Sequence, residues 1–320
     1  MRDRGLGVGV GGRGLAWVVR LGLCAVLGPV VAGAQDAAAS LVKEARALSI
    51  ANDQEAAIPL FERALVLAPD DFGGHLGLGI ALDESGDYTR AQQHLRRAID
   101  LAPDGARDRA ITAMAVSYAF EGKPAESATY YEQLRDRQLA ARNPFGAAET
   151  ANSLARVYLE SGDPDAAERW YRTAYDAVMA LPDLRPEQQE LAELRWLFAA
   201  ARIEARRGRF DLARQHLDAL RTIFAAMPDT GINADQRVFL PYAVGYVELA
   251  AGNADGAVAE LRQSNQEDPF VLMLIAQAHE LKGDAALARD AYERILGIYA
   301  HNVGAAFARP LARQKLGRTP

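Results

Sequence analysis

The feature that most constrains this chain is a glycine-marked helix ending that recurs along almost its whole length. The glycines are Gly86, Gly122, Gly162, Gly208, Gly252 and Gly283, and Asn52 takes the equivalent place before the first of them. Glycine adopts the left-handed backbone conformation that follows a helix at almost no cost, and asparagine is the next most tolerant residue. A helix ending that returns at intervals of tens of residues predicts a stack of similar helical units.

Two helices are expected in each unit, one on either side of the marker. Before Gly86, the apolar residues Leu78 and Leu82 are four positions apart, as on one face of a helix. Proline then ends the second helix of the unit. The first two units align at a distance of 34 positions, where Ala57, Phe61, Ala64 and Pro69 recur as Ala91, Leu95, Ala98 and Pro103.

This pattern resembles the tetratricopeptide repeat, a helix–turn–helix unit of about 34 residues. The agreement is closest in three units, at Leu78, Gly79, Leu82, Ala91, Leu95, Ala98 and Pro103, at Leu154, Ala155, Tyr158, Ala167, Tyr171 and Ala174, and at Leu272, Ala276, Ala288 and Tyr292. The resemblance covers roughly residues 38–300. It implies an all-α fold, a right-handed superhelical solenoid of about seven helix–turn–helix repeats.

A final helix is expected after the last repeat, over residues 302–316. Asn302 is suited to be its N-cap, and Val303, Phe307 and Leu311 fall on one face of it. We interpret this segment as a C-terminal capping helix that covers the end of the solenoid. Pro310 is expected to shorten it.

The middle units are longer than the family repeat. From Asn52 onward, the steps between successive markers are 34, 36, 40, 46, 44 and 31 residues. Two segments rich in turn-forming residues, 181–186 and 227–231, fall inside the long steps. We therefore expect longer helices or inserted loops in the middle units.

The first 34 residues have the features of a secretory signal peptide. Four arginines precede an apolar stretch at residues 21–31, and small residues at 32–34 suit a cleavage site after Ala34. The alternative is an uncleaved anchor, although Arg20 and Pro29 interrupt its apolar span. Cleavage predicts an exported protein, periplasmic or secreted, with no stable transmembrane segment.

The chain is accordingly divided into a signal peptide (1–34), a repeat solenoid (35–300), and a C-terminal capping helix and tail (301–320). The single cysteine, Cys24, falls in the signal peptide, so the mature chain has no disulfide and no cysteine metal site. Removal of residues 1–34 takes away four arginines and one aspartate. Of 36 basic and 42 acidic residues, 32 and 41 then remain. This acidic balance excludes nucleic acid as the expected partner.

No catalytic constellation is visible, and the chain is not expected to be an enzyme. The histidines His75, His94, His216, His279 and His301 are spread over different units without the spacing of metal ligands. Asp83 and Glu84 are interpreted as solvated or capping charges. Neither a cofactor nor a metal is expected.

The resemblance implies that the first helix of each repeat lines a concave groove. It places a cluster of polar and aromatic side chains there, namely Asn152, Arg156, Arg195, Phe198, Arg202, Tyr242 and Tyr246. Arginine and asparagine can hold a carboxylate or an extended backbone, and aromatic rings supply contact area. The early units add a mostly apolar wall that includes Leu76, Ile80 and Val116, and the seventh unit adds Phe270 and Met273. The competing interpretation is that the aromatic rings pack on neighbouring helices and the arginines pair with nearby acids.

These observations favour a non-enzymatic protein–protein interaction scaffold or adaptor in the cell envelope, which binds a protein or an extended peptide in its concave groove. A rigid groove binds without an ordering cost of its own. Two alternatives stay open. One is an accessory protein that binds a small ligand or glycan for an envelope enzyme, and the other is a self-assembling structural unit.

Overall fold

The computed structural model of the protein describes residues 27–226 and 236–318. The signal peptide expected at residues 1–34 lies mostly outside these ranges, and the turn expected at residues 227–231 lies wholly outside them. Every regular element within the ranges is a helix, so the all-α prediction is confirmed. None of these described helices is both long enough and apolar enough to cross a membrane.

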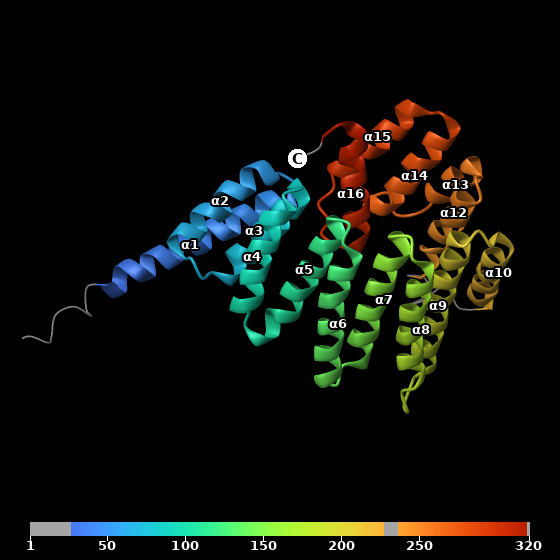
Figure 1. Cartoon of the computed structure of the whole chain (residues 1–320), viewed down its shortest axis with the longest axis horizontal. Coiled ribbons are helices and arrows are strands. Elements are labelled where there is room, and N and C mark those ends of the chain that lie inside the picture. The colour runs from blue at the N-terminus through green and yellow to red at the C-terminus, as the bar shows by residue number, and fades with distance from the viewer. Residues whose placement is uncertain (1–26, 227–235, 319–320) are drawn as a thin grey trace, which may run out of the picture.

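The described helices form seven successive hairpins and one final helix (Figure 1). The hairpins are α1 (Leu27–Ile50) with α2 (Gln54–Leu67), α3 (Phe72–Ser85) with α4 (Tyr88–Leu101), α5 (Arg107–Phe120) with α6 (Pro124–Ala140), α7 (Pro144–Glu160) with α8 (Pro164–Met179), α9 (Pro186–Arg206) with α10 (Phe210–Ala226), α12 (Leu240–Ala250) with α13 (Ala254–Leu261), and α14 (Pro269–Lys282) with α15 (Ala285–Leu296). The final helix is α16 (Val303–Leu316), and the short 3-10 helix η1 (Asp104–Ala106) joins α4 to α5.

Each hairpin turns at its predicted marker. All six marker glycines have positive φ, with 97° at Gly86, and Asn52 has a φ of 63°. A capping side chain then begins most of the second helices: the Asp163 carboxylate, for example, accepts a hydrogen bond of 2.9 Å from the Ala166 amide. The glycine ends one helix and the cap starts the next, which fixes the tight turn between them.

Longer helices account for much of the extra length of the middle units. α3, α4 and α5 each have 14 residues, whereas α6 and α7 have 17 and α9 has 21. These longer helices extend beyond the level of the early units in Figure 1. The prediction of stretched middle units is therefore confirmed.

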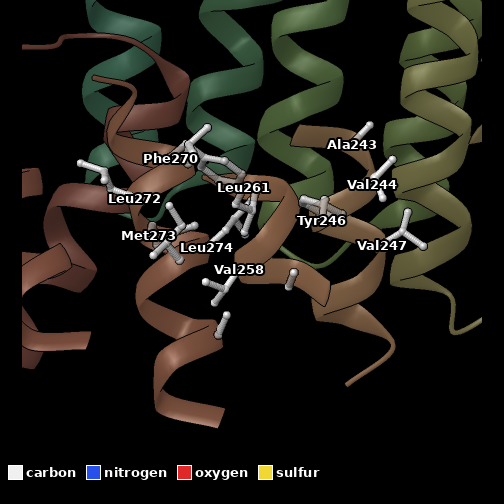
Figure 2. Packing of buried hydrophobic residues seen from close by; sticks show 14 of the residues in the cluster. Ala243, Val244, Tyr246, Val247, Val258, Leu261, Phe270, Leu272, Met273 and Leu274 are labelled. Carbon is white, nitrogen blue, oxygen red and sulfur yellow. The ribbon is translucent and has the colours of Figure 1, made fainter. Parts of the chain in front are cut away.

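Small residues bring the two helices of a hairpin together. A Cβ added at Gly79 would lie 2.6 Å from Leu95 Cγ, and one added at Gly245 would lie 2.5 Å from Leu261 Cγ. Such positions exclude any side chain larger than hydrogen without a shift of the partner helix. Figure 2 shows the packing in the last units, where Leu261 of α13 lies beside Phe270 of α14 in the same apolar cluster.

The final helix does more than cover the end of the stack. Its N-cap is Asn302, as predicted, whose side-chain oxygen accepts a hydrogen bond of 2.9 Å from the Ala305 amide. Pro310 lies inside the helix, so the expectation that it would shorten the helix is wrong. α16 packs on α14 and α15, as a cap would, and also reaches back to α5 and α7 (Figure 1).

Candidate binding site

An open pocket lies between α7, α8 and α9, in the stretched part of the stack, and is called here the α7–α9 pocket. Its volume is about 250 Å³. It is lined by Phe145, Ala148, Glu149, Asn152, Tyr171, Ala174, Tyr175, Val178, Arg185, Gln188, Leu191, Ala192, Arg195 and Trp196. Two of the seven predicted groove residues, Asn152 and Arg195, are among them.

The polar side chains of this pocket are available to a ligand. Arg195 is exposed, and its nearest acidic partner is Glu149, with Nη2 and Oε1 3.6 Å apart. Within the described part of the chain, the Asn152 amide has no side-chain hydrogen-bond partner. Arg185 is exposed, and its side chain donates a hydrogen bond of 3.3 Å from Nε to Gln188 Oε1, with no acidic partner among the described residues. Exposed ion pairs contribute little to stability, so these groups can exchange partners at low cost.

An apolar surface lies beside these polar groups. Phe145 is 40% exposed although it is a large apolar side chain. The Trp196 ring is only half-buried: the Arg172 guanidinium carbon is 4.3 Å from its ring centroid, and its centroid is 6.1 Å from that of Tyr175. The pocket thus combines cations, an amide and aromatic faces, which suits an extended peptide.

Arg202 is not in the open pocket, because it is buried between hairpins. It is 8% exposed. Nη2 donates to the Tyr171 hydroxyl at 3.0 Å, Nη1 donates to the Tyr242 hydroxyl at 3.2 Å, and Nε donates to the Phe198 carbonyl at 3.2 Å. The arginine therefore joins α8, α9 and α12. Phe198 is also buried, with its ring 6.2 Å from that of Phe224.

Tyr246 and Arg156 are likewise held by neighbouring helices. Tyr246 is 3% exposed, and its hydroxyl lies 3.2 Å from Glu160 Oε2 and accepts a hydrogen bond from Arg206. Burial raises the pKa of this hydroxyl far above its usual value. The Arg156 guanidinium lies over the Phe270 ring at 4.6 Å from its centroid. Around these residues the structure favours the packing interpretation.

The apolar wall expected in the early units is covered by the end of the chain. Leu76, Ile80 and Val116 are all buried. Tyr299, in the loop before α16, packs against the cluster that contains Leu76 and Ile80, and Val303 of α16 packs in the cluster of Val116. This part of the concave face is therefore not open to a partner while α16 is in place.

Asp83 and Glu84 are not solvated charges, so that expectation is wrong. They are 0% and 1% exposed. Asp83 lies 2.9 Å from His301 Nε2 and accepts a hydrogen bond of 2.7 Å from Ser117. Glu84 accepts a hydrogen bond of 3.1 Å from the Ala300 amide. Both carboxyl groups therefore attach the last loop of the chain to α3.

Burial raises the pKa of both carboxyl groups above their usual values. The hydrogen bond from His301 opposes this shift at Asp83, and the charge of Arg309 opposes it at Glu84. Burial also lowers the pKa of the Arg309 guanidinium. No group of three or more histidine, cysteine, aspartate or glutamate residues in the described ranges is arranged to hold a metal ion.

The segments that match known protein families coincide with the hairpins described above. Family models of the tetratricopeptide repeat match residues 42–106, 108–179 and 242–303, which together span more than half of the chain. The chain belongs to the tetratricopeptide repeat family. The stretch between the second and third matched segments contains α9 and α10, where the tetratricopeptide pattern is most lengthened.

Two solved structures are similar to this chain. A tetratricopeptide repeat protein from Parabacteroides merdae is similar over 88% of this chain and 98% of its own, with 13% sequence identity and a TM-score of 0.51. The PilF protein of Pseudomonas aeruginosa is similar over 79% of this chain and 99% of its own, with 15% identity and a TM-score of 0.44. The first of these likenesses shows a shared tetratricopeptide fold. No curated protein matches the sequence.

Several pocket residues were not among the predicted ones. Phe145, Arg185 and Trp196 line the α7–α9 pocket but lie outside the helix positions that a tetratricopeptide repeat directs into its groove. The sequence carried a signal for one of them: Arg185 belongs to the inserted segment 181–186, and it lines the same pocket as Asn152.

Proposed function

We propose that this protein is a non-enzymatic interaction scaffold or adaptor of the cell envelope, which binds an extended segment of a partner protein in the α7–α9 pocket. Tetratricopeptide repeats generally mediate protein–protein interactions, and proteins built from them are generally scaffolds. The observation that carries the proposal is the exposure of Arg195 beside the unpartnered Asn152 amide, at the one part of the predicted cluster that no neighbouring helix occupies within the described residues.

The chemistry of the pocket indicates the kind of peptide that fits it. Arg185 and Arg195 attract a carboxylate, and charge-assisted hydrogen bonds to arginine are the stronger kind. The Asn152 amide can donate to a backbone carbonyl and accept from a backbone amide. The exposed faces of Phe145 and Trp196 suit an apolar side chain. The proposed ligand is an extended peptide in which an acidic residue is close to an apolar one.

A binding comparison tests this function. We expect Arg195→Glu and Asn152→Ala each to weaken capture of partner proteins about tenfold, since each removes one or two hydrogen bonds worth about 1 kcal/mol or more. The mature chain is crosslinked in its own envelope fraction, and the captured proteins are quantified by mass spectrometry. Arg214→Glu on α10 is the matched control, because Arg214 is exposed to a similar extent at 48%, against 43% for Arg195.

Partners lost from the two pocket variants but kept by Arg214→Glu support the proposal. An identical set of partners with all four proteins, each shown to melt like the wild type, contradicts it.

Export is part of the proposal and rests on the N-terminal sequence. The arginine-rich front, the apolar stretch and the small residues before Gln35 are the supporting features. We expect the purified envelope protein to begin at Gln35, which intact mass measurement and N-terminal sequencing check. A chain that starts at Met1, recovered from the cytoplasmic fraction, would refute export by this route.

A further inference from the structure

A second surface of the concave face lies between α5, α7 and α14, and α16 occupies it in this structure (Figure 1). It is called here the α16 groove. Val116 and Phe120 of α5 and Leu154 of α7 form one apolar cluster in it. Phe270 of α14 lies on its other side and is fully buried. These large side chains belong to the first helices of three different repeats.

The face of α16 that enters this groove is made of small residues. Val303, Ala305 and Ala306 are buried in the cluster of Val116 and Leu154. At Gly304, an added Cβ would lie 3.2 Å from Phe270 Cβ and 3.2 Å from Arg156 Nη2. Small side chains facing large ones allow the helix to approach closely. The groove is therefore shaped for a helix with an alanine- and glycine-rich face.

Charge also matches between the helix and the groove. α16 carries basic residues and no acidic residue, in a chain that is acidic overall. Arg309 donates to the Glu84 backbone carbonyl at 3.3 Å, and the Glu84 carboxyl charge also acts on it. Lys315 Nζ lies 2.8 Å from Glu280 Oε1. The groove thus favours a helix with basic side chains, which meet Glu84 of α3 and Glu280 of α14.

The fit of α16 is incomplete in its polar contacts. Arg309 Nε and Arg313 Nη1 are buried without a hydrogen-bond partner in the described structure, and so is Arg156 Nε on the groove side. A buried donor without a partner loses its hydration and gains nothing in return. Pro310 also removes one hydrogen bond from within the helix. Because of these features, the docking of α16 is less stable than its apolar contacts alone would make it.

The connection of α16 allows it to leave without unfolding a repeat. It is joined to α15 through residues 297–302, a short segment outside the repeat helices. An element whose polar contacts are incomplete opens at lower free energy than the core. We propose that the α16 groove is a second binding surface, whose ligand is a basic, alanine-rich amphipathic helix of a partner protein, and that α16 is the internal occupant which this helix displaces.

This proposal goes beyond the α7–α9 pocket, since it concerns other residues and another ligand. It is the helix-in-groove mode of recognition. The apparent affinity of such a groove for a free helix is reduced by the fraction of molecules in which α16 is docked. Weakening the docking of α16 alone should therefore raise the affinity for the same helix added separately.

The test uses the full chain and a fluorescent peptide of residues 302–318. Ala306→Arg in the chain introduces a large cation where Ala306 is buried, and leaves every groove residue unchanged. We expect the peptide to bind this variant at least tenfold more tightly than it binds the wild-type chain, as measured by fluorescence anisotropy. A peptide with Ala306→Arg should not bind. A peptide with Arg318→Ala should bind like the unchanged one, because Arg318 is exposed.

Three results would overturn the proposal. The first is no binding of the unchanged peptide to an Ala306→Arg chain that keeps its helical circular dichroism and cooperative melting. The second is equal binding of the unchanged and Ala306→Arg peptides. The third is a wild-type chain that sediments as a dimer with exchanged α16 helices, which would make a second copy the occupant.

Two further measurements keep the test decisive if Ala306→Arg does not fold. Arg309→Ala in the chain removes the donor to Glu84 without adding bulk, and should raise the affinity for the peptide in the same direction. In the wild-type chain, saturating unlabelled peptide should accelerate amide hydrogen exchange of residues 303–316. Unchanged exchange at saturation would contradict displacement.

Discussion

Replacement of Phe270 by alanine is expected to lower the free energy of unfolding by about 3–5 kcal/mol, the usual cost of removing a fully buried aromatic side chain. Phe270 is 0% exposed. Its ring lies under the Arg156 guanidinium and 6.3 Å from the Tyr242 ring, and its Cβ faces Gly304. One side chain thus supports α7, α12, α14 and α16. Urea unfolding followed by circular dichroism measures the loss.

Phe145→Ala is the matched control for this prediction. Phe145 is the same residue type but is 40% exposed in the α7–α9 pocket. Surface changes of this kind usually alter stability by no more than about 0.5 kcal/mol. Equal losses for Phe270→Ala and Phe145→Ala would show that the concave face near α14 is not packed as described.

The second large effect is expected at Arg202. Arg202→Ala leaves the buried hydroxyl group of Tyr171 and the partly buried hydroxyl group of Tyr242 without the donor that each has now. A buried polar group left without a partner costs about 1–3 kcal/mol, so the pair predicts a loss of about 2–5 kcal/mol. Thermal unfolding measures it. Loss of binding by this variant would therefore not identify a contact with a partner.

Arg195→Ala provides the comparison, because Arg195 lies two helical turns before Arg202 on the same helix, α9, but is exposed. We expect its stability to stay within about 0.5 kcal/mol of the wild type. An Arg202→Ala chain as stable as the Arg195→Ala chain would place Arg202 among the exposed groove residues, as the sequence pattern first suggested. The stabilities of these two variants thus distinguish the predicted groove residues that hold the helices together from those that are free to bind a partner.

The local architecture could be predicted because its causes are local. A glycine such as Gly86 ends a helix by its own backbone freedom, and a small residue such as Gly79 has its contact within the same hairpin. The helix period of the apolar residues and the spacing of the markers then identify each unit. Even the longer helices of the middle units follow from counting residues between markers.

Closure of the groove could not be predicted in this way, because it depends on contacts between distant segments. The Glu84 carboxylate and the Ala300 amide are 216 positions apart. No periodic pattern links them, and in isolation Asp83 and Glu84 look like any other acidic pair at a helix end. One signal was present: residues 269–276 are apolar on every side of a helix, and a helix of that kind is buried all round. Phe270 and Met273 were therefore poor candidates for an open groove.

The contacts of Asn52 connect the first hairpin of the solenoid to its last hairpin and to α16. Its side-chain amide donates to the Leu296 carbonyl at 2.8 Å, and Arg309 reaches both Asn52 and α3. In an open repeat array each unit touches only its neighbours, so the ends fray first and stability adds up along a line. Here the first two units share contacts with the last. While α16 is docked, the array is joined into a loop, and the opening of α16 is expected to loosen the first units as well as the last.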